Sequence, residues 1–421
     1  MRIYLDNCAS TQVSSEAAKA IYFAMTENYA NPSALHLAGQ EAERLVKQAR
    51  HQIAFSIGTK SGNIIFTSGG TEANNLALFS CFYSDSCDGG GDIPGKPKAL
   101  LISAVEHPAV YAAADALARR GARVERIPVF GADTDFPGMV DVSAFRAMLA
   151  DDVSLVSVLH VSNEIGTIQP IEELSRIVSL HNSENGANIR LHVDAAQSYG
   201  KLGIDVDNGD LRRVDFVSMS AHKLHGPKGI GALYAASPAK LHPMVFGGGQ
   251  EGGVRSGTEN VPGIVGFGAC ARIASAEIVA HAKHANTCRR RLLDGIKAEI
   301  PHVHINSPED ASITGKPGCS SPYILSLSFL GTRGEVLVHE LEKSGIFVST
   351  GAACATLSKN AGSGKNGNAS GVLAAVGASD EVMEGTLRFG ISWTNVPDEM
   401  DFVIDRLKKA VTRFRRTGSY R

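Results

Sequence analysis

A lysine that follows an apolar run carries the most distinctive chemistry in this sequence. Lys223 comes three residues after Asp215–Ser220, an apolar run that predicts a strand, and glycines and small residues surround it. Ligands of open α/β sheets bind where such strands end, and an amine desolvated there can lose its charge and form a Schiff base. His222 and Ser220 could hold a phosphate beside it. Taken alone, such a residue is more often a surface lysine at a strand end.

Three further motifs supply what a phosphorylated pyridine cofactor needs. Gly70 and Thr71 lie in a glycine turn between a predicted strand and a predicted helix, where backbone N–H groups attract a phosphate. Asp194 ends another predicted strand, three residues before Gln197, and its carboxylate can pair with a pyridinium nitrogen. His107 follows a third strand and could stack on a flat ring as an acid or base. Gly-Gly turns are common, and a lone histidine is more often structural than catalytic. The prediction of a cofactor site therefore rests on these motifs occurring together with Lys223.

The elements that must position these residues alternate between strands and helices. Leu37–Ile57 has apolar residues at three- and four-residue steps and predicts a helix. After it, apolar runs predict seven strands, at Asn63–Ser68, Ala99–Ser103, Val124–Val129, Ser154–Val161, Arg190–Ala195, Asp215–Ser220 and Gly231–Ala235. Most of these runs are continuously apolar, as expected of strands with helices on both faces of the sheet. We therefore expect an α/β fold with a large, mainly parallel, seven-stranded sheet.

The C-terminal part of the sequence changes to an α+β pattern. The glycine-rich stretch Phe246–Gly257 predicts a junction, and a long helix is expected from about Gly263 to Ile300. Short strands are predicted beyond it, at His302–Asn306, Ile324–Phe329, Ile346–Ser349 and Thr386–Ser392. We expect two domains, a large one of residues 13–260 and a smaller one of residues 1–12 plus 261–421. Two segments are predicted to be flexible loops, Ser84–Pro97 and Ser358–Gly371.

The composition is that of an ordinary globular protein. The chain has 421 residues, of which 43% are hydrophobic and 20% charged, and its formal net charge of -2 gives no reason to expect nucleic acid or a membrane as the main partner. No apolar run is expected to span a bilayer, and Ile3–Asp6 begins the chain with no signal-peptide pattern. The seven cysteines are scattered, with no CxxC pair and no cluster suited to a metal, so we expect a cytoplasmic protein.

Nine short motifs are spread from the first residues to the second expected domain. They are Tyr4-Leu5-Asp6-Asn7, Asn31-Pro32-Ser33, Thr67-Ser68-Gly69-Gly70-Thr71-Glu72, Glu106-His107, Asn163-Glu164-Ile165-Gly166, Val193-Asp194-Ala195-Ala196-Gln197, Ser220-Ala221-His222-Lys223, Gly247-Gly248-Gly249-Gln250-Glu251 and Arg255-Ser256-Gly257-Thr258-Glu259-Asn260. In this order they resemble the fold-type I enzymes of pyridoxal 5'-phosphate (PLP), within the class V aminotransferase branch that contains the cysteine desulfurases. The resemblance covers nearly the whole chain and implies PLP as the cofactor.

The resemblance also implies a role for each matching residue. Lys223 would carry PLP as a Schiff base, and His107 would stack on the ring as a catalytic acid or base. The other cofactor contacts would come from Asp194 at the pyridine nitrogen, from Asn163 and Gln197 beside the 3-hydroxyl, and from Gly70, Thr71, Ser220 and His222 at the phosphate. Thr258 would reach the phosphate of the neighbouring subunit, which implies a homodimer. Arg388, helped by Asn163, would bind the substrate carboxylate, a task that suits the arginine fork.

Cys354 differs from the other cysteines in its surroundings. The other six are expected to be small buried hydrophobes, namely Cys8, Cys81, Cys87, Cys270, Cys288 and Cys319. Cys354 follows a predicted strand and precedes the predicted loop Ser358–Gly371, where an exposed thiol can act as a nucleophile. The stretch Ser349–Thr356 resembles the desulfurase motif in which a serine or threonine, a glycine and two small residues precede the nucleophilic cysteine.

Together these features imply a cysteine desulfurase that converts L-cysteine to L-alanine through a persulfide on Cys354. The sulfur would pass to an acceptor protein for iron–sulfur cluster or other thio-cofactor synthesis. Selenocysteine lyase is the open alternative, because its relatives share the lysine site and a similar loop cysteine. A non-catalytic PLP-binding scaffold is a remoter one, since Lys223, Cys354 and Arg388 are all present. The sequence departs from the family pattern at Ala9-Ser10-Thr11, Ser162 and Gly252-Gly253, which leaves the chemistry in place and the sulfur acceptor open.

Overall fold

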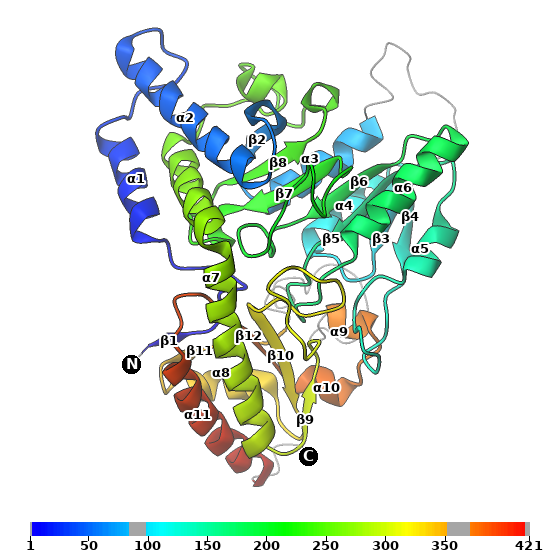
Figure 1. The fold of residues 1–421 in the computed structure, drawn as a ribbon, viewed down its shortest axis with the longest axis vertical. Coiled ribbons are helices and arrows are strands. Elements are labelled where there is room, and N and C mark those ends of the chain that lie inside the picture. Colours follow the sequence, from blue (N-terminus) through cyan, green and yellow to red (C-terminus); the bar gives the residue numbers. More distant parts are fainter. Residues whose placement is uncertain (1, 84–97, 352–370, 417–421) are drawn as a thin grey trace.

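The chain folds around one large sheet and two smaller ones. The computed structural model describes residues 2–83, 98–351 and 371–416. Figure 1 shows the large sheet and its helices in the upper half, the smaller sheets below, and one long helix that runs along both. The two segments predicted to be flexible loops lie outside the described residues, apart from Gly371, which begins α9. The arrangement confirms the expected α/β fold.

The large sheet contains seven strands in the order β2-β8-β7-β6-β5-β3-β4. The strands are β2 (Ile64–Thr67), β3 (Ala99–Ser103), β4 (Arg123–Ile127), β5 (Val153–Leu159), β6 (Arg190–Asp194), β7 (Phe216–Ser220) and β8 (Gly231–Ala235). Only β8 runs against the others, being antiparallel to both β7 and β2. The sheet is therefore mainly parallel, and all seven strand predictions are confirmed with ends that shift by up to two residues.

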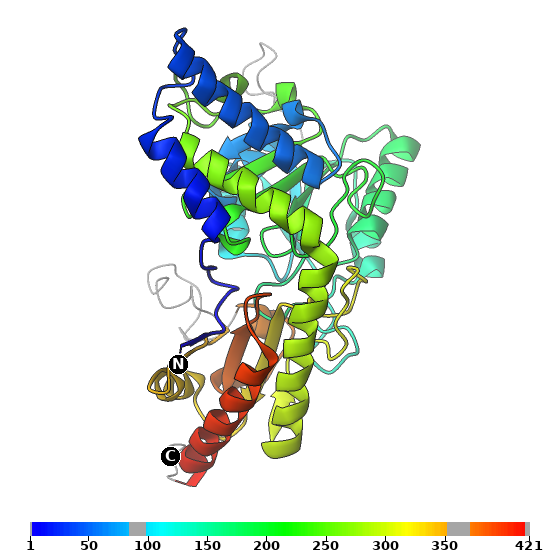
Figure 2. The same cartoon turned by 60° about the vertical axis from the view of Figure 1, so that its left-hand side comes forward.

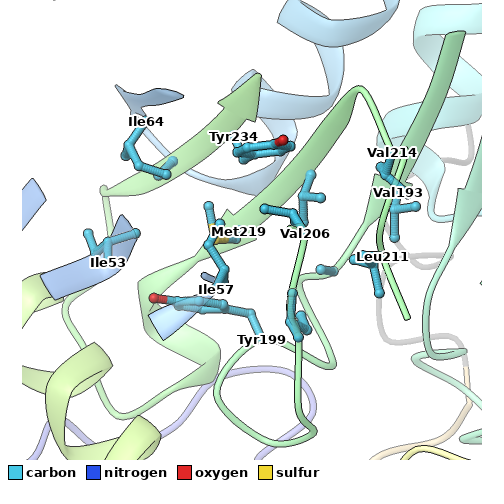
Figure 3. Packing of buried hydrophobic residues seen from close by; sticks show 14 of the residues in the cluster. Ile53, Ile57, Ile64, Val193, Tyr199, Val206, Leu211, Val214, Met219 and Tyr234 are labelled. Atoms are coloured by element: carbon cyan, nitrogen blue, oxygen red, sulfur yellow. The ribbon is translucent and has the colours of Figure 1, made fainter. Parts of the chain in front are cut away.

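Apolar side chains cover both faces of this sheet, which explains why its strands are continuously apolar. Leu100 and Ile102 of β3 pack with α3 and α4, whereas Leu101 lies in the core on the opposite face. In Figure 3, Ile53 of α2 lies near Met219 of β7 in that second core. The helices around the sheet are α1 (Ser15–Thr26), α2 (Leu37–Ser56), α3 (Gly70–Tyr83), α4 (Pro108–Ala118), α5 (Val142–Met148) and α6 (Ile171–Asn185). Because helices close both faces, ligands reach the sheet only at its edges.

The two smaller sheets are formed by the C-terminal half of the chain together with the N-terminal strand β1. One is antiparallel, in the order β12-β10-β9, and the other pairs β1 with β11 in parallel. Their strands are β1 (Ile3–Tyr4), β9 (Val303–Ile305), β10 (Ile324–Phe329), β11 (Ile346–Phe347) and β12 (Thr386–Gly390). Four helices accompany them, α8 (Gly334–Glu342), α9 (Gly371–Ala375), α10 (Asp380–Glu384) and α11 (Pro397–Arg416). The four strands predicted in this part of the sequence are confirmed, and β1 draws the N-terminus into the same unit.

A single helix, α7 (Val261–Glu299), runs the length of the molecule and contributes to two cores. Its first half packs against α1 and α2 beside the large sheet, and its second half packs against α11, as Figure 2 shows. By length and composition α7 could cross a membrane, contrary to the sequence-based expectation, and no other described helix could. Side chains such as Phe267 and Leu292 are buried inside the protein, so its apolar character is that of a core helix. The domain boundary at residue 260 remains a proposal.

Gly231, the first residue of β8, provides a test of how tightly the sheet edge is packed. A Cβ atom at this position would lie 2.6 Å from the carbonyl oxygen of Met219 and 2.7 Å from Gly69. Both contacts are to backbone, so the strand ends would have to move apart. We expect Gly231→Ala to lower the free energy of unfolding by about 1–3 kcal/mol, measured by denaturant titration. Gly203→Ala is the matched control, because no atom lies within 4 Å of its added Cβ; equal stability of the two variants would contradict the packing.

Candidate active site

The residues singled out by the sequence motifs meet at the carboxyl edge of the large sheet. They stand at or just after the ends of successive strands, with Gly70 and Thr71 after β2, His107 after β3, Asn163 after β5, Asp194 and Gln197 after β6, and Ser220, His222 and Lys223 after β7. Arg388 comes from β12 of a smaller sheet and donates a hydrogen bond to the backbone oxygen of Asn163 at 3.1 Å. Cys354 lies outside the described residues, and Thr258 is exposed on the loop before α7. The edge therefore gathers nearly all of the predicted set.

Lys223 points at the N-terminal segment of the chain. Its amine donates hydrogen bonds to the backbone oxygens of Cys8 and Ala9, at 2.5 and 2.8 Å. Burial, and next the positive charge of Lys201, lower the pKa of this amine to about 8. A lysine with this pKa supplies far more uncharged amine near neutral pH than an ordinary one, as bond formation to a carbonyl group requires.

Asp194 is held rigidly at the end of β6. One of its carboxylate oxygens accepts a hydrogen bond from the side-chain amide of Asn74 at 2.7 Å, and the other accepts one from the backbone of Ala196 at 2.9 Å. The side chain is only 6% exposed. Asn74 stands on α3, so the helix that begins at the glycine turn also orients the carboxylate.

The glycine turn and the end of β7 form a set of donors suited to a phosphate. A Cβ atom on Gly70 would lie 3.7 Å from the Cβ of Ser220, so the start of α3 touches the end of β7. The Ser220 hydroxyl is buried and has no hydrogen-bond partner among the described residues. Burial and the nearby lysines lower the pKa of His222 to about 4, so this histidine would donate as a neutral ring. The orphan hydroxyl and the helix N-terminus fit the phosphate of PLP.

His107 combines a structural task with a chemical one. Its Nδ1 accepts a hydrogen bond from the backbone N–H of Ala109 at 3.1 Å and so caps α4. An accepting Nδ1 places the proton of the neutral ring on Nε2. Burial lowers the pKa of His107 and outweighs the nearby negative charge of Asp194. The ring is therefore neutral at neutral pH and offers one N–H group.

The neighbouring carboxyl group of Glu106 is deeply buried beneath this histidine. It accepts hydrogen bonds from the Ser103 hydroxyl at 2.6 Å and from the backbone of Leu159 at 2.8 Å. Burial raises its pKa to about 8, so the carboxyl group is largely protonated at neutral pH. These contacts tie the end of β3 to β5 and fix the start of the turn that carries His107.

Arg388 presents a buried cation to the same space. Its guanidinium forms an ion pair with Asp6 at 3.1 Å, and the side chain of the residue is almost fully buried. Its Nε is buried and has no partner in the described part of the chain. An unpaired N–H on a buried guanidinium is the donor that a substrate carboxylate needs.

The sequence motifs did not reveal four residues that shape this site. Asp6 pairs with Arg388, Cys8 offers the carbonyl to Lys223, Asn74 orients Asp194, and Lys201 places a second ammonium group nearby. Asp6 lies inside a motif that was matched without a role. The amide of Gln197 bonds the carbonyl of Cys8 at 2.9 Å, and its predicted contact with the 3-hydroxyl of PLP remains a prediction.

The cysteines divide into two groups by burial. Cys8, Cys81, Cys270 and Cys288 are buried, as expected from the sequence. Cys319 is only half-buried, contrary to that expectation, because it lies in an irregular loop that precedes β10. Cys87 and Cys354 fall outside the described residues. No group of three or more His, Cys, Asp or Glu side chains in the described ranges could hold a metal ion.

Comparison with known proteins agrees with this geometry. The family described as aminotransferase class-V matches residues 3–403. The chain belongs to this family. Class-V aminotransferases depend on PLP, and the donors at the α3 N-terminus, the Asp194 carboxylate and the Lys223 amine fit that cofactor.

Individual relatives match over nearly the full length. The cysteine desulfurase IscS of Dictyoglomus turgidum is 34% identical over 419 residues, which cover 100% of this chain and 97% of that protein. The cysteine desulfurase NifS of Azotobacter vinelandii is also 34% identical, over 99% of this chain and 94% of its own. A solved structure called a NifS-like protein superposes with a TM-score of 0.83 and 32% identity, covering 98% of this chain and all of the other. The fold-type and desulfurase resemblance predicted from the motifs is confirmed.

The capping role of His107 can be separated from its chemistry. We expect His107→Ala to lower the free energy of unfolding by about 1 kcal/mol, because the first turn of α4 loses its cap. His107→Asn should keep most of that stability, since the amide oxygen can accept the same hydrogen bond. Both variants remove the Nε2 proton. Thermal unfolding of the two proteins measures the difference; an asparagine variant as unstable as the alanine variant would show that the cap contributes nothing.

Proposed function

We propose that this chain is a PLP-dependent cysteine desulfurase, which takes sulfur from L-cysteine, releases L-alanine and hands the sulfur to an acceptor protein. One observation carries the proposal: the Lys223 amine and the Arg388 guanidinium approach the N-terminal segment from opposite units, so an amino acid can be held at both ends. Full-length similarity to proteins named cysteine desulfurase supports it. Iron–sulfur cluster or other thio-cofactor synthesis would use the product sulfur.

The described residues divide the work of substrate binding and proton transfer. Bound PLP supplies an electron sink that stabilises negative charge on the substrate Cα. Arg388 holds the substrate carboxylate through its unpaired Nε, with its orientation fixed by Asp6 and by the backbone of Asn163. Lys223, with a pKa of about 8, moves the proton at Cα. His107 exchanges a proton with the substrate sulfur through its Nε2 atom.

Cys354 is the proposed nucleophile that receives the sulfur. Its thiolate would attack the substrate sulfur, forming a new S–S bond while the carbon–sulfur bond breaks and leaves its electron pair on the alanine skeleton. The sequence places Cys354 a few residues after β11 and before α9, on a connection between two elements of the smaller unit. Transfer of the terminal sulfur to an acceptor then restores the thiolate.

A serine at position 354 tests this function. Cys354→Ser should lower L-alanine formation from L-cysteine by ~10²-fold or more, because a hydroxyl cannot replace the thiolate. Mass spectrometry should find one added sulfur atom on Cys354 of the parent and none in the variant. Cys319→Ser is the matched control, a half-buried thiol that should leave both readouts unchanged. Alanine formation at the parent rate in Cys354→Ser would refute the nucleophile, and parallel assays with L-selenocysteine decide between desulfurase and selenocysteine lyase.

A homodimer is the proposed assembly. Seven large apolar side chains on α1, α2 and their connection are exposed, namely Tyr22, Phe23, Met25, Tyr29, Leu35, Leu37 and Phe55. Three more, Met244, Val245 and Phe246, are exposed on the loop that leads to Thr258. Exposed apolar side chains gathered in this way are typical of subunit interfaces. The loop would bring Thr258 toward the phosphate of the neighbouring subunit.

Charges placed in this patch should dissociate the dimer. We expect the double variant Leu35→Asp/Leu37→Asp to sediment as a monomer in analytical ultracentrifugation, whereas the parent sediments as a dimer, because buried unpaired carboxylates oppose association. Leu35 is 93% exposed in the single chain, so the change should leave the fold intact. Leu180→Asp on α6, which covers the same face of the sheet as α2 but stands apart from α1 and α2 in Figure 1, is the control and should stay dimeric. A dimeric double variant would place the interface elsewhere, and a monomeric parent would refute the assembly.

The cytoplasm remains the proposed location. Among the described residues five cysteines are free thiols, which is typical of a reducing compartment.

A further inference from the structure

We propose that Lys201, a second buried lysine, is a positioning residue that acts on the cofactor site through Lys223 and Gln197. The inference rests on the attachment of PLP to Lys223, which is part of the proposed function. It adds to that function one residue, Lys201, whose side chain has no role in the chemistry described above.

Lys201 is an unusual lysine because it is buried without a carboxylate. It lies in the turns after β6 and is only 6% exposed. Its ammonium nitrogen stands 5.7 Å from the centre of the Tyr323 ring and forms no ion pair with a carboxylate of the described residues. Burying a charge in this way costs free energy, and within the described part of the chain Lys201 receives in return a weak cation–π contact and one long hydrogen bond. Such a cost is typical of residues retained for function.

Lys201 and Lys223 line the same cavity. This cavity opens beside the turn that carries Lys223, and Asn7 and Tyr323 also line it. Two ammonium groups facing one poorly hydrated space repel each other, so one of them gives up its proton at a lower pH. Burial lowers the pKa of both amines, and the positive charge of Lys201 lowers the pKa of Lys223 further.

The other charged groups around Lys223 act in both directions. The Arg388 cation on β12 also lowers the pKa of the Lys223 amine, whereas the Asp6 carboxylate and the Cys8 thiol on the N-terminal segment raise it. The Asp6 carboxylate is already paired with Arg388, and this pairing weakens its electrostatic attraction to the Lys223 ammonium group. After burial, Lys201 is the largest single influence on this amine.

Lys201 also fixes the direction of the Gln197 amide. Its ammonium group can only donate, so the oxygen Oε1 of Gln197 turns toward it, at 3.4 Å. The Nε2 group then points to the backbone oxygen of Cys8, at 2.9 Å. The amine of Lys223 donates to the same carbonyl oxygen. Gln197 therefore presents its N–H donors on the cofactor side, where the 3-hydroxyl of PLP is expected.

Both effects bear on the attachment of the cofactor. The uncharged Lys223 amine attacks the aldehyde carbon of PLP through its nitrogen lone pair, and the aldehyde oxygen leaves as water with two protons, so a C=N bond replaces the C=O bond. Only the uncharged amine can do this, and the charge of Lys201 increases its fraction at neutral pH. Removing that charge should slow attachment near pH 7 without removing any group that touches PLP.

The test measures the attachment of PLP to apoprotein by absorbance, between about pH 6 and pH 10, without L-cysteine. We expect Lys201→Met to move the midpoint of the rate profile upward by about one unit, with an attachment rate ~10-fold slower near pH 7. Lys201→Arg keeps the charge and should show the same pH dependence of the attachment rate as the parent. Lys240→Met is the matched control, because this exposed lysine lies outside the cavity. Coincident Lys201→Met and parent profiles would overturn the proposal.

Further outcomes distinguish a failure of this inference from a failure of the proposed function. If Lys201→Met does not fold, Lys201→Gln takes its place, and a parent midpoint at the ordinary lysine pKa of about 10.4 would by itself overturn the proposal. A protein that attaches PLP with a Lys201-dependent profile and forms no alanine would refute the proposed function alone. A working desulfurase whose profile ignores Lys201 would refute only this inference.

Discussion

The structure depends on one short N-terminal segment that lies between the large sheet and the smaller ones. Its backbone oxygens at Cys8 and Ala9 receive the amine of Lys223, and its Asp6 carboxylate receives the guanidinium of Arg388. The hydroxyl of Thr11 donates to the backbone oxygen of His222 at 2.9 Å. The six residues from Asp6 to Thr11 thus hold the cofactor lysine and the substrate arginine in one space. Displacing this segment would separate the two halves of the site.

A second constraint is the balance of charge in that space. Around the Lys223 amine stand two cations, Lys201 and Arg388, and the carboxylate of Asp6. The excess positive charge favours the uncharged form of Lys223 and attracts the two anions that the proposed reaction brings, a phosphate and a carboxylate. Burial first, and then the charges of Lys223, Lys228 and Lys201, lower the pKa of His222 and keep its ring neutral beside the phosphate site.

Much of the fold and of the site could be read from the sequence, for identifiable reasons. Strands such as Ala99–Ser103 were predictable because helices cover both faces of the sheet, which leaves a continuous apolar run. Site residues at strand ends were predictable because parallel strands share one edge. The Asp6–Arg388 pair joins residues 382 positions apart, and no local pattern encodes it. Lys201 was missed because a buried lysine in a turn looks like an exposed one in sequence.

The pairing of β1 with β11 has a consequence for the order of events during synthesis. Ile3 pairs with Ile346, so β1 waits for a partner that is translated 343 residues later. Until then β1 lacks its sheet partner, although every strand of the large sheet has already emerged. Ribosomes that add roughly 5–20 residues per second leave this interval many seconds long. Assembly of the site therefore has to wait for the smaller unit, and a chain truncated before β11 would also lack β12 and with it Arg388.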